Sequence, residues 1–228
     1  MLQAIIREIT PPYLLKILKK IRLFIIHSDT QVDDDKLIDD DKLFNGDNLL
    51  FKSLAKKASI YGEYGCGHST IWISNNTQIK IISVDSSKIW IEKIKGIVKE
   101  QQEIMFQWID CGELEEWGRP KTYEKRENFQ NYINAIWQYP SFKPDLILID
   151  GRFRVACLLA SLLNSNPGTK IIFDDYFDRP HYHVVEEFIQ PIDKCGRQAL
   201  FIVPSAELDT LLIEKIKLEI LNFRYVLD

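Results

Sequence analysis

Three aspartates in the second half of the sequence have the clearest potential for chemistry. Asp150 ends the apolar run DLILID, and Asp174 and Asp175 end the apolar run TKIIFDD. If both runs form neighbouring parallel strands, which lie about 4.8 Å apart, the carboxyl ends of the strands bring the three carboxylates together. Such a cluster requires a cation, because unpaired carboxylates repel one another and raise one another's pKa.

Two kinds of cation could balance this charge. Oxygen ligands favour a hard divalent ion such as Mg²⁺, which could lower the pKa of a bound hydroxyl and orient it for reaction. The alternative is ion pairing, because Arg152, Arg154 and Arg179 lie near the aspartates in the sequence and a guanidinium can take the place of a metal. A third alternative is that the aspartates only cap the strand ends at the surface.

A second chemical signature is the glycine-rich segment EYGCGHS at 63–69. Gly65 and Gly67 have no Cβ, so the main chain can adopt unusual angles there and a ligand can touch it. Asp85 ends the next apolar run, where its carboxylate could accept hydrogen bonds from two ribose hydroxyls. The segment and the acid together predict a nucleoside-containing cofactor. The alternative is a glycine turn that only packs a strand against a helix.

Thr70 separates this segment from dinucleotide-binding loops. The fingerprint G-x-G-x-x-G would place its third glycine at position 70, where this sequence has threonine. The departure favours a nucleoside cofactor without a pyrophosphate. It disfavours a nucleotide-sugar or nicotinamide enzyme, as does the lack of a Tyr-x-x-x-Lys pair after the fourth strand.

The elements that must position these residues alternate along the chain. Strand-like runs lie at 59–64, 79–85, 104–110, 145–150, 169–175 and 198–204. Helical patterns lie at 69–75, 87–101, 128–138, 153–164, 181–190 and near 206–217, and the segment 218–228 reads as a last strand. This alternation predicts a doubly wound α/β fold, with a mostly parallel seven-stranded sheet and helices on both faces. In such sheets ligands bind beyond the carboxyl ends of the strands, where the aspartates lie. The irregular segment 111–127 is expected to be a substrate lid.

The residues before this pattern read as an N-terminal extension. Residues 13–26 place their apolar side chains on one helical stripe, and residues 29–41 contain seven aspartates. We therefore divide the chain into an amphipathic helix with an acidic linker at 1–45 and a domain at 46–228. The basic helix could dock on its own domain, lie on an anionic membrane surface or contact a second copy of the chain.

Composition and charge restrict the class of protein. Hydrophobic residues make up 46% of the 228 residues and charged residues 27%, which is typical of a globular domain. The net charge of −4 offers no footprint for a polyanion, so no nucleic-acid partner is expected. The four cysteines form no C-x-x-C pair, which argues against a zinc site and a disulfide framework. Without a signal peptide or a membrane-spanning run, we expect a cytoplasmic protein, either free or peripheral to a membrane.

The ordered set EYGCGHS, ISVD and WID resembles the cofactor-binding motifs of class I S-adenosylmethionine-dependent methyltransferases. The resemblance covers roughly residues 55–205. It implies that Gly65 and Gly67 line the methionine part of the cofactor, that Asp85 holds the ribose, and that Asp110 lies beside the adenine. The full set of cofactor-binding residues that it implies is Glu63, Gly65, Gly67, His68, Ser69, Asp85 and Asp110.

The segments DLILIDG and IIFDDYFDRP look like the metal-binding pattern of magnesium-dependent O-methyltransferases, both the catechol type and those acting on sugars. This resemblance implies Asp150, Asp174 and Asp175 as Mg²⁺ ligands, with Asp150 and Asp174 also catalytic. In a metal-free version His181 or His183 could be the general base, because imidazole titrates near neutral pH. The alternative for either histidine is a structural hydrogen bond in a first helical turn.

On this resemblance we expect an enzyme that uses S-adenosylmethionine, with Mg²⁺ as a second cofactor, to methylate a hydroxyl of a small molecule or a glycan. The rival hypothesis is a non-catalytic cofactor-binding or scaffolding domain of the same fold that associates through residues 13–26. A methyl-transfer assay on candidate acceptors distinguishes the two.

Overall fold

The computed structural model of this protein describes residues 40–227. The helix predicted at 13–26 and the acidic segment up to residue 39 lie outside these residues, so the predicted N-terminal extension stays a prediction. Within residues 40–227, no helix is both long enough and apolar enough to span a bilayer.

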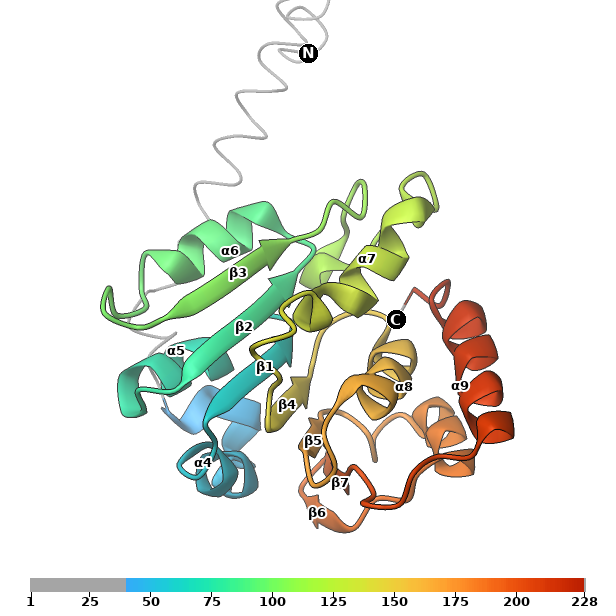
Figure 1. Ribbon diagram of the computed structural model, residues 1–228. Coiled ribbons are helices and arrows are strands. Elements are labelled where there is room, and N and C mark those ends of the chain that lie inside the picture. The colour runs from blue at the N-terminus through green and yellow to red at the C-terminus, as the bar shows by residue number, and fades with distance from the viewer. Residues whose placement is uncertain (1–39, 228) are drawn as a thin grey trace, which may run out of the picture. The chain divides into compact units, whose positions relative to one another are not determined.

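A seven-stranded sheet in the order β3-β2-β1-β4-β5-β7-β6 forms the centre of the domain (Figure 1). The strands are β1 (Ile60–Tyr64), β2 (Lys80–Asp85), β3 (Ile104–Trp108), β4 (Leu146–Ile149), β5 (Lys170–Phe173), β6 (Asp193–Cys195) and β7 (Gln198–Ile202). Strands β1 to β5 are parallel, β7 runs antiparallel to β5, and β6 runs antiparallel to β7. The predicted doubly wound, mostly parallel seven-stranded fold is therefore confirmed.

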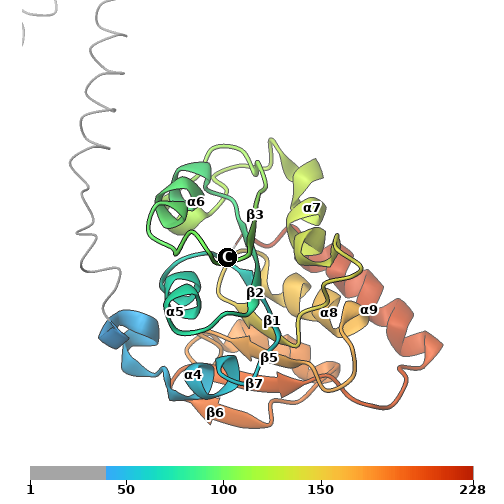
Figure 2. The ribbon, with the colours of Figure 1, turned by 60° about the vertical axis from the view of Figure 1, so that its left-hand side comes forward.

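Helices cover both faces of the sheet (Figure 2). One face carries α4 (Leu49–Ala55), α5 (His68–Asn76) and α6 (Lys88–Lys95), and the other carries α7 (Phe129–Asn134), α8 (Arg154–Asn164) and α9 (Thr210–Phe223). Short 3-10 helices lie at Asp40–Gly46, Glu116–Gly118, Arg126–Asn128, Ala135–Trp137 and Pro180–Glu187. The layers leave the carboxyl ends of the parallel strands as the edge where loops gather.

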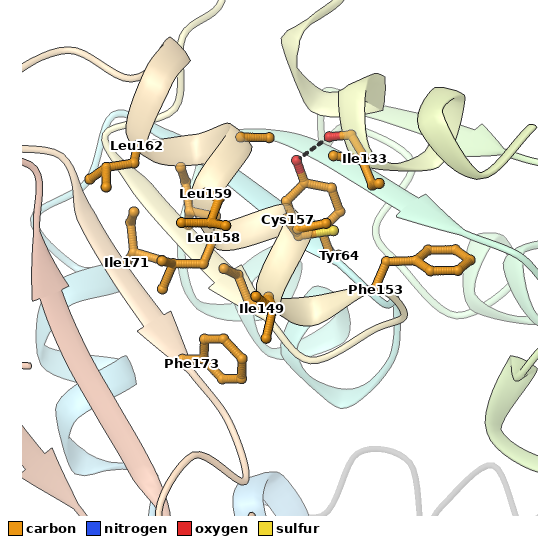
Figure 3. Close-up of a cluster of buried hydrophobic side chains, with 14 of the residues drawn as sticks. Tyr64, Ile133, Ile149, Phe153, Cys157, Leu158, Leu159, Leu162, Ile171 and Phe173 are labelled. Carbon is orange, nitrogen blue, oxygen red and sulfur yellow. Dashed lines mark hydrogen bonds between the residues drawn. The ribbon is translucent and has the colours of Figure 1, made fainter. Parts of the chain in front are cut away.

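The alternation of side chains along each strand divides the core into two clusters. Ile147 and Ile149 of β4 belong to the larger cluster, which lies against α7, α8 and α9. Leu146 and Leu148 belong to the smaller cluster, against α4 and α5. Both faces of β4 are therefore apolar, as expected for a central parallel strand. Figure 3 shows part of the larger cluster, where the Tyr64 hydroxyl donates a 2.6 Å hydrogen bond to a carbonyl of α7.

The predicted helix near 206–217 followed by a strand at 218–228 is wrong. A single helix, α9, spans Thr210–Phe223, and the Asp209 side chain caps it by accepting a 2.9 Å hydrogen bond from the Leu212 N–H. Its buried residues Ile216 and Ile220 are four apart, so the apolar residues beyond 217 continue a helical face. The seventh strand is instead the three-residue β6, which is too short to show an alternating pattern.

Three predicted boundaries also differ from the structure. The helix predicted at 87–101 ends at Lys95, where Gly96, a poor helix former, follows it. The helix predicted at 181–190 is a 3-10 helix over Pro180–Glu187. The strand predicted at 104–110 ends at Trp108, so Asp110 lies in the following loop.

Candidate functional site

The loop after β1 and the turn after β4 touch at the centre of the sheet. These neighbouring strands continue into α5 and α8 on opposite faces, and such a switch point opens a crevice in this class of fold. Gly65 adopts a left-handed φ of +92°, and a Cβ there would lie 2.9 Å from the carbonyl oxygen of Asp150. Only glycine fits this approach, so Gly65 serves the contact between the two loops.

Gly67 leaves open space on the other side of the same loop. Its missing Cβ would have only one neighbour within 4 Å, the Trp90 Nε1 atom at 3.9 Å. Trp90, from α6, donates a 2.6 Å hydrogen bond from this nitrogen to the carbonyl of Cys66 and so fixes the loop. The sequence analysis did not identify Trp90, which carries no motif signal. The main chain at Gly67 is accessible to a ligand, as the glycine pattern predicts.

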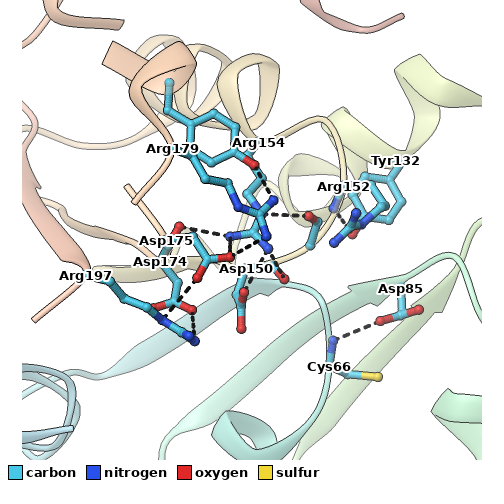
Figure 4. A network of polar contacts seen from close by, with 12 residues as sticks. Cys66, Asp85, Tyr132, Asp150, Arg152, Arg154, Asp174, Asp175, Arg179 and Arg197 are labelled. Carbon is cyan, nitrogen blue, oxygen red and sulfur yellow. Dashed lines mark hydrogen bonds and ion pairs between the residues drawn. The ribbon is translucent and has the colours of Figure 1, made fainter. Parts of the chain in front are cut away.

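Asp85 ends β2 with its carboxylate turned toward the glycine loop (Figure 4). The side chain accepts hydrogen bonds from the Cys66 N–H at 3.1 Å and the Ser87 N–H at 2.7 Å. Burial raises the pKa of Asp85, and these two backbone donors oppose the rise. A carboxylate has about four acceptor positions. The Cys66 side chain is a third donor to this carboxylate, so Asp85 keeps capacity for at least one further donor, such as a hydroxyl of a ribose.

Glu63 has no such capacity left. Its carboxylate is fully buried and accepts hydrogen bonds from four hydroxyl groups: those of Tyr61, Ser69, Thr70 and Ser83. Thr70 in turn accepts a 2.9 Å hydrogen bond from the Gly67 N–H. Burial raises the pKa of Glu63, and the hydroxyl donors oppose that shift. We interpret Glu63 and Ser69 as residues that position the loop, and direct cofactor contact by either stays a prediction.

Asp110 lies in the loop after β3, and His68 lies at the start of α5. Asp110 accepts a 3.0 Å hydrogen bond from the Gly112 N–H, and its carbonyl accepts one of 2.8 Å from the Asn128 amide. These bonds shape the loop that follows β3. His68 is half-buried at the first position of α5. The roles of both residues toward a cofactor stay predictions.

Asp150, Asp174 and Asp175 lie together, as predicted from the adjacent strands. Each offers a carboxylate oxygen, and the three oxygens lie within 4.8 Å of one another. Asp174 is fully buried, whereas the side chains of Asp175 and Asp150 are 15% and 35% exposed. Asp150 is therefore the most exposed member of the cluster.

Arg154 links the members of the cluster (Figure 4). Its buried guanidinium lies 3.1 Å from an Asp150 oxygen and 3.3 Å from an Asp175 oxygen. It also donates to the backbone carbonyls of Gly151 at 3.0 Å and Asp174 at 2.9 Å. A single cation thus binds the carboxyl ends of both β4 and β5.

Two further arginines complete the charge balance. Arg197 contacts Asp174 at 2.6 Å and Asp175 at 3.1 Å, and Arg179 contacts Asp175 at 2.9 Å. The sequence analysis named Arg179 but missed Arg197, which reaches the cluster from the turn between β6 and β7. That turn follows a strand too short to predict, so no sequence signal placed it at the site.

The aspartate cluster does not fit a divalent metal ion. Three guanidinium groups already neutralise the three carboxylates, and Arg154 contacts the side-chain and main-chain oxygens that would otherwise face a cation. Binding of Mg²⁺ would require the buried Arg154 to leave. The geometry supports the ion-pairing alternative of the sequence analysis, and no catalytic step is assigned to a metal.

The turn between β4 and α8 is strained in a way that fixes Asp150 and Arg154. Phe153 has a left-handed φ of 55°, an outlier for a bulky residue, and is buried. Its ring packs against Phe129 at 4.7 Å and Tyr132 at 5.5 Å between ring centroids. Packing of Phe153 in the core therefore fixes the backbone that positions the side chains of Asp150 and Arg154.

Burial and charged neighbours shift the pKa of Asp150. Burial raises its pKa to about 7; Arg154 opposes that rise, and Asp174 and Asp175 add to it. Its Oδ1 atom pairs with Arg154, and its Oδ2 atom has no partner among residues 40–227. A carboxylate that titrates near neutral pH is well matched to accept a proton during catalysis.

The two histidines after β5 are placed differently. His183 stacks on Tyr176 with ring centroids 4.7 Å apart, and its Nε2 atom lies 3.2 Å from the Tyr176 carbonyl. His181 is exposed and lies against the ring of Tyr182. The contacts of His183 fit the structural hydrogen bond that the sequence analysis left open, and a catalytic role of either histidine stays a prediction.

Comparison with known proteins gives one informative match. No protein-family model and no curated protein matches the sequence. Among solved structures, a methyltransferase-like protein from Silicibacter pomeroyi is 30% identical, over 75% of this chain and 91% of that chain, with a TM-score of 0.66.

More distant matches include the N-methyltransferase NodS from Bradyrhizobium japonicum, at 15% identity over 72% of this chain and 99% of that chain, with a TM-score of 0.46. A 1,6-didemethyltoxoflavin-N1-methyltransferase from Burkholderia thailandensis is 12% identical over 85% of this chain and 88% of that chain, with a TM-score of 0.43. The strand order, the glycine loop and the match at 30% identity lead to one conclusion: the chain belongs to the methyltransferase-like family with the class I S-adenosylmethionine-dependent methyltransferase fold.

Proposed function

We propose that the protein is an S-adenosylmethionine-dependent methyltransferase that acts on a hydroxyl of a small molecule or a glycan. The observation that carries the cofactor assignment is the position of Asp85, whose carboxylate binds the Cys66 N–H of the glycine loop and has acceptor capacity left. A hydroxyl donor of a ribose matches this arrangement. When bound, S-adenosylmethionine supplies a methyl group on a sulfonium centre.

Different residues of the proposed site contact different parts of the reactants. Asp85 would accept a ribose hydroxyl of the cofactor, and the main chain at 65–67 would hold its methionine part. The backbone of Asp150 lies against Gly65, where an added Cβ would come within 2.9 Å of the Asp150 carbonyl oxygen. At that end the acceptor hydroxyl gives its proton to Asp150 Oδ2, while Arg154 holds Oδ1 in place. Orientation of the acceptor against the methyl group supplies much of the rate.

Binding and turnover are measured separately. Calorimetric titration with S-adenosylmethionine and S-adenosylhomocysteine tests the cofactor assignment. Transfer of a radioactive methyl group to a panel of phenolic, sugar and amine acceptors then tests catalysis. Binding with transfer to hydroxyl acceptors supports the proposal. Transfer to amines alone refutes the hydroxyl assignment, and binding without any transfer favours the non-catalytic domain.

The replacement Asp85→Ala is expected to weaken S-adenosylhomocysteine binding by at least about 10- to 100-fold, because each hydrogen bond to a charged group contributes about 1.5–3 kcal/mol. Calorimetry on the variant measures the loss. The matched control is Asp193→Ala, which removes an exposed aspartate of β6. Unchanged affinity in Asp85→Ala would remove the ribose assignment.

Methyl transfer is expected to persist in a chelator and to show no stimulation by added Mg²⁺, because the arginines already balance the aspartate cluster. Initial rates of EDTA-dialysed protein, with and without Mg²⁺, test this expectation. A loss of activity that Mg²⁺ alone restores would return the cluster to the magnesium-dependent class. A loss that no ion restores would indicate damage by dialysis, and gel filtration before and after dialysis identifies it.

A further inference from the structure

The segment predicted as a lid contains an ordered hairpin. Leu114 pairs with Pro120 across it, and the Glu115 N–H donates a 2.7 Å hydrogen bond to the Arg119 carbonyl. The side chain of Arg119 also forms an ion pair with that of Glu115. The residues between the two sides, Glu116–Gly118, form the 3-10 turn at the tip. The tip is thus presented on a defined support.

This tip is fastened beside Asp85. The hydroxyl of Ser86, the next residue after Asp85, donates a 2.6 Å hydrogen bond to the Gly118 carbonyl. A Cβ at Gly118 would lie 2.8 Å from that hydroxyl and 3.7 Å from an Asp85 carboxylate oxygen. Trp108 donates a 3.0 Å hydrogen bond to the Ser86 carbonyl and holds it from the other side. The hairpin tip therefore borders the proposed ribose position.

Trp117 lies at the tip with an exposed side chain and a strained backbone, both of which are unfavourable when no ligand is bound. It is 89% exposed, and its φ of 62° lies in the left-handed region, which is an outlier for a bulky side chain. Its indole makes no hydrogen bond or ring contact with any residue in the described part of the chain. Strained backbone of this kind clusters at ligand sites.

The other exposed indole nearby is already engaged. Trp108 is 44% exposed, but its Nε1 atom bonds to Ser86 and the Lys88 ammonium lies 5.1 Å above its ring. Trp117, the chain neighbour of Gly118, is 89% exposed, so its ring remains available to a ligand. Aromatic faces stack on nucleobases of any sequence.

We propose that Trp117 stacks on the purine of the bound nucleoside, an inference that rests on the proposed function. With the ribose held by Asp85, the adenosine would lie beside the hairpin tip, because Gly118 borders Asp85. The methionine part would extend the other way, toward Gly65, whose loop touches the Asp150 backbone. Stacking on the purine would explain why the Trp117 backbone is strained and its indole is exposed.

The experiment compares two ligands on the full-length chain. S-adenosylhomocysteine and 5′-methylthioadenosine share the adenosine, but the second lacks the amino-acid end. Calorimetric titrations are carried out on the wild type, Trp117→Ala, Trp117→Phe and the control Leu211→Ala, which shortens an 84% exposed leucine of α9. We expect Trp117→Ala to weaken both ligands by about 5- to 100-fold, and Trp117→Phe to retain most of the affinity.

The outcomes separate this inference from the proposed function. If the wild type binds neither ligand, the proposed function fails. If the wild type binds both and Trp117→Ala binds them equally well, only the stacking inference fails. A loss confined to S-adenosylhomocysteine would also overturn it, because a stacking residue must act on the shared adenosine. Quenching of tryptophan fluorescence on ligand addition, present in the wild type and reduced in Trp117→Phe, provides a second readout.

Discussion

Replacement of Asp150 by asparagine is expected to lower kcat by about 100-fold or more, the usual contribution of a positioned general base. Affinity for S-adenosylhomocysteine should stay nearly unchanged, because the proposed cofactor contacts lie at Asp85 and the glycine loop. Asparagine keeps the Oδ1 acceptor that Arg154 contacts, so the cluster stays assembled. The variant loses only the ability to accept a proton. Single-turnover rates together with calorimetry separate the two effects.

The pH dependence of the methyl-transfer rate identifies the group that acts as the general base. Because the pKa of Asp150 is raised to about 7, the wild-type rate should rise with pH and level off above that value, where the carboxylate is ionised. Asp150→Asn should lack this limb. Asp178→Asn, which changes an exposed aspartate after β5, is the control and should keep it. A normal rate in Asp150→Asn, or an unchanged profile, would move the base elsewhere, with His181 the first candidate.

Stability should vary with pH in the opposite direction. The folded-state pKa of Asp150 lies above the ordinary value of 3.8, so the folded protein binds the proton more tightly than the unfolded chain does. The contribution of Asp150 to the free energy of unfolding therefore falls as pH rises from about 4 to about 7 and then levels off. Activity and stability at this residue conflict, as expected for a base that burial keeps poised.

Much of the architecture could be predicted because the parallel strands are continuous apolar runs ended by acids. Asp85 is the last residue of β2, and Asp150 follows β4 directly. The juxtaposition of Asp150 with Asp174 and Asp175 follows from the pairing of adjacent strands alone. Local pattern and global topology agree at these positions.

The remaining features depend on contacts between segments far apart in the sequence. Arg197 meets Asp174 only because β7 pairs with β5, and Trp90 reaches the Cys66 carbonyl only through the packing of α6. The saturation of Glu63 by four hydroxyls is likewise a property of the assembled core. A motif can place an acid at a strand end, but it cannot show which partners have already used its lone pairs.

Removal of Arg154, the buried cation of the aspartate cluster, is expected to have a large effect on stability. Arg154→Met should lower the free energy of unfolding by about 3–5 kcal/mol, the usual result of removing one partner from a buried ion pair. Asp150 and Asp175 then lose their shared buried cation, and the carbonyls that Arg154 joins lose their donor. Denaturant titration at pH 8 measures the loss. The matched control is Arg179→Met, since Arg179 is 40% exposed and a surface pair contributes about 0–1 kcal/mol.

Metal binding by Arg154→Met also tests whether the Arg154 guanidinium takes the place of a metal ion. Once Arg154 is gone, three carboxylate oxygens within 4.8 Å of one another face a site without its central cation, and a hard divalent ion prefers such ligands. Millimolar Mg²⁺ should therefore raise the stability of Arg154→Met more than that of the wild type or of Arg179→Met. The deficit of Arg154→Met should also shrink at pH 4, where protonation relieves repulsion among the aspartates. If Mg²⁺ stabilises the wild type as strongly as the variant, the guanidinium does not occupy the place of the metal, and the ion-pair assignment falls.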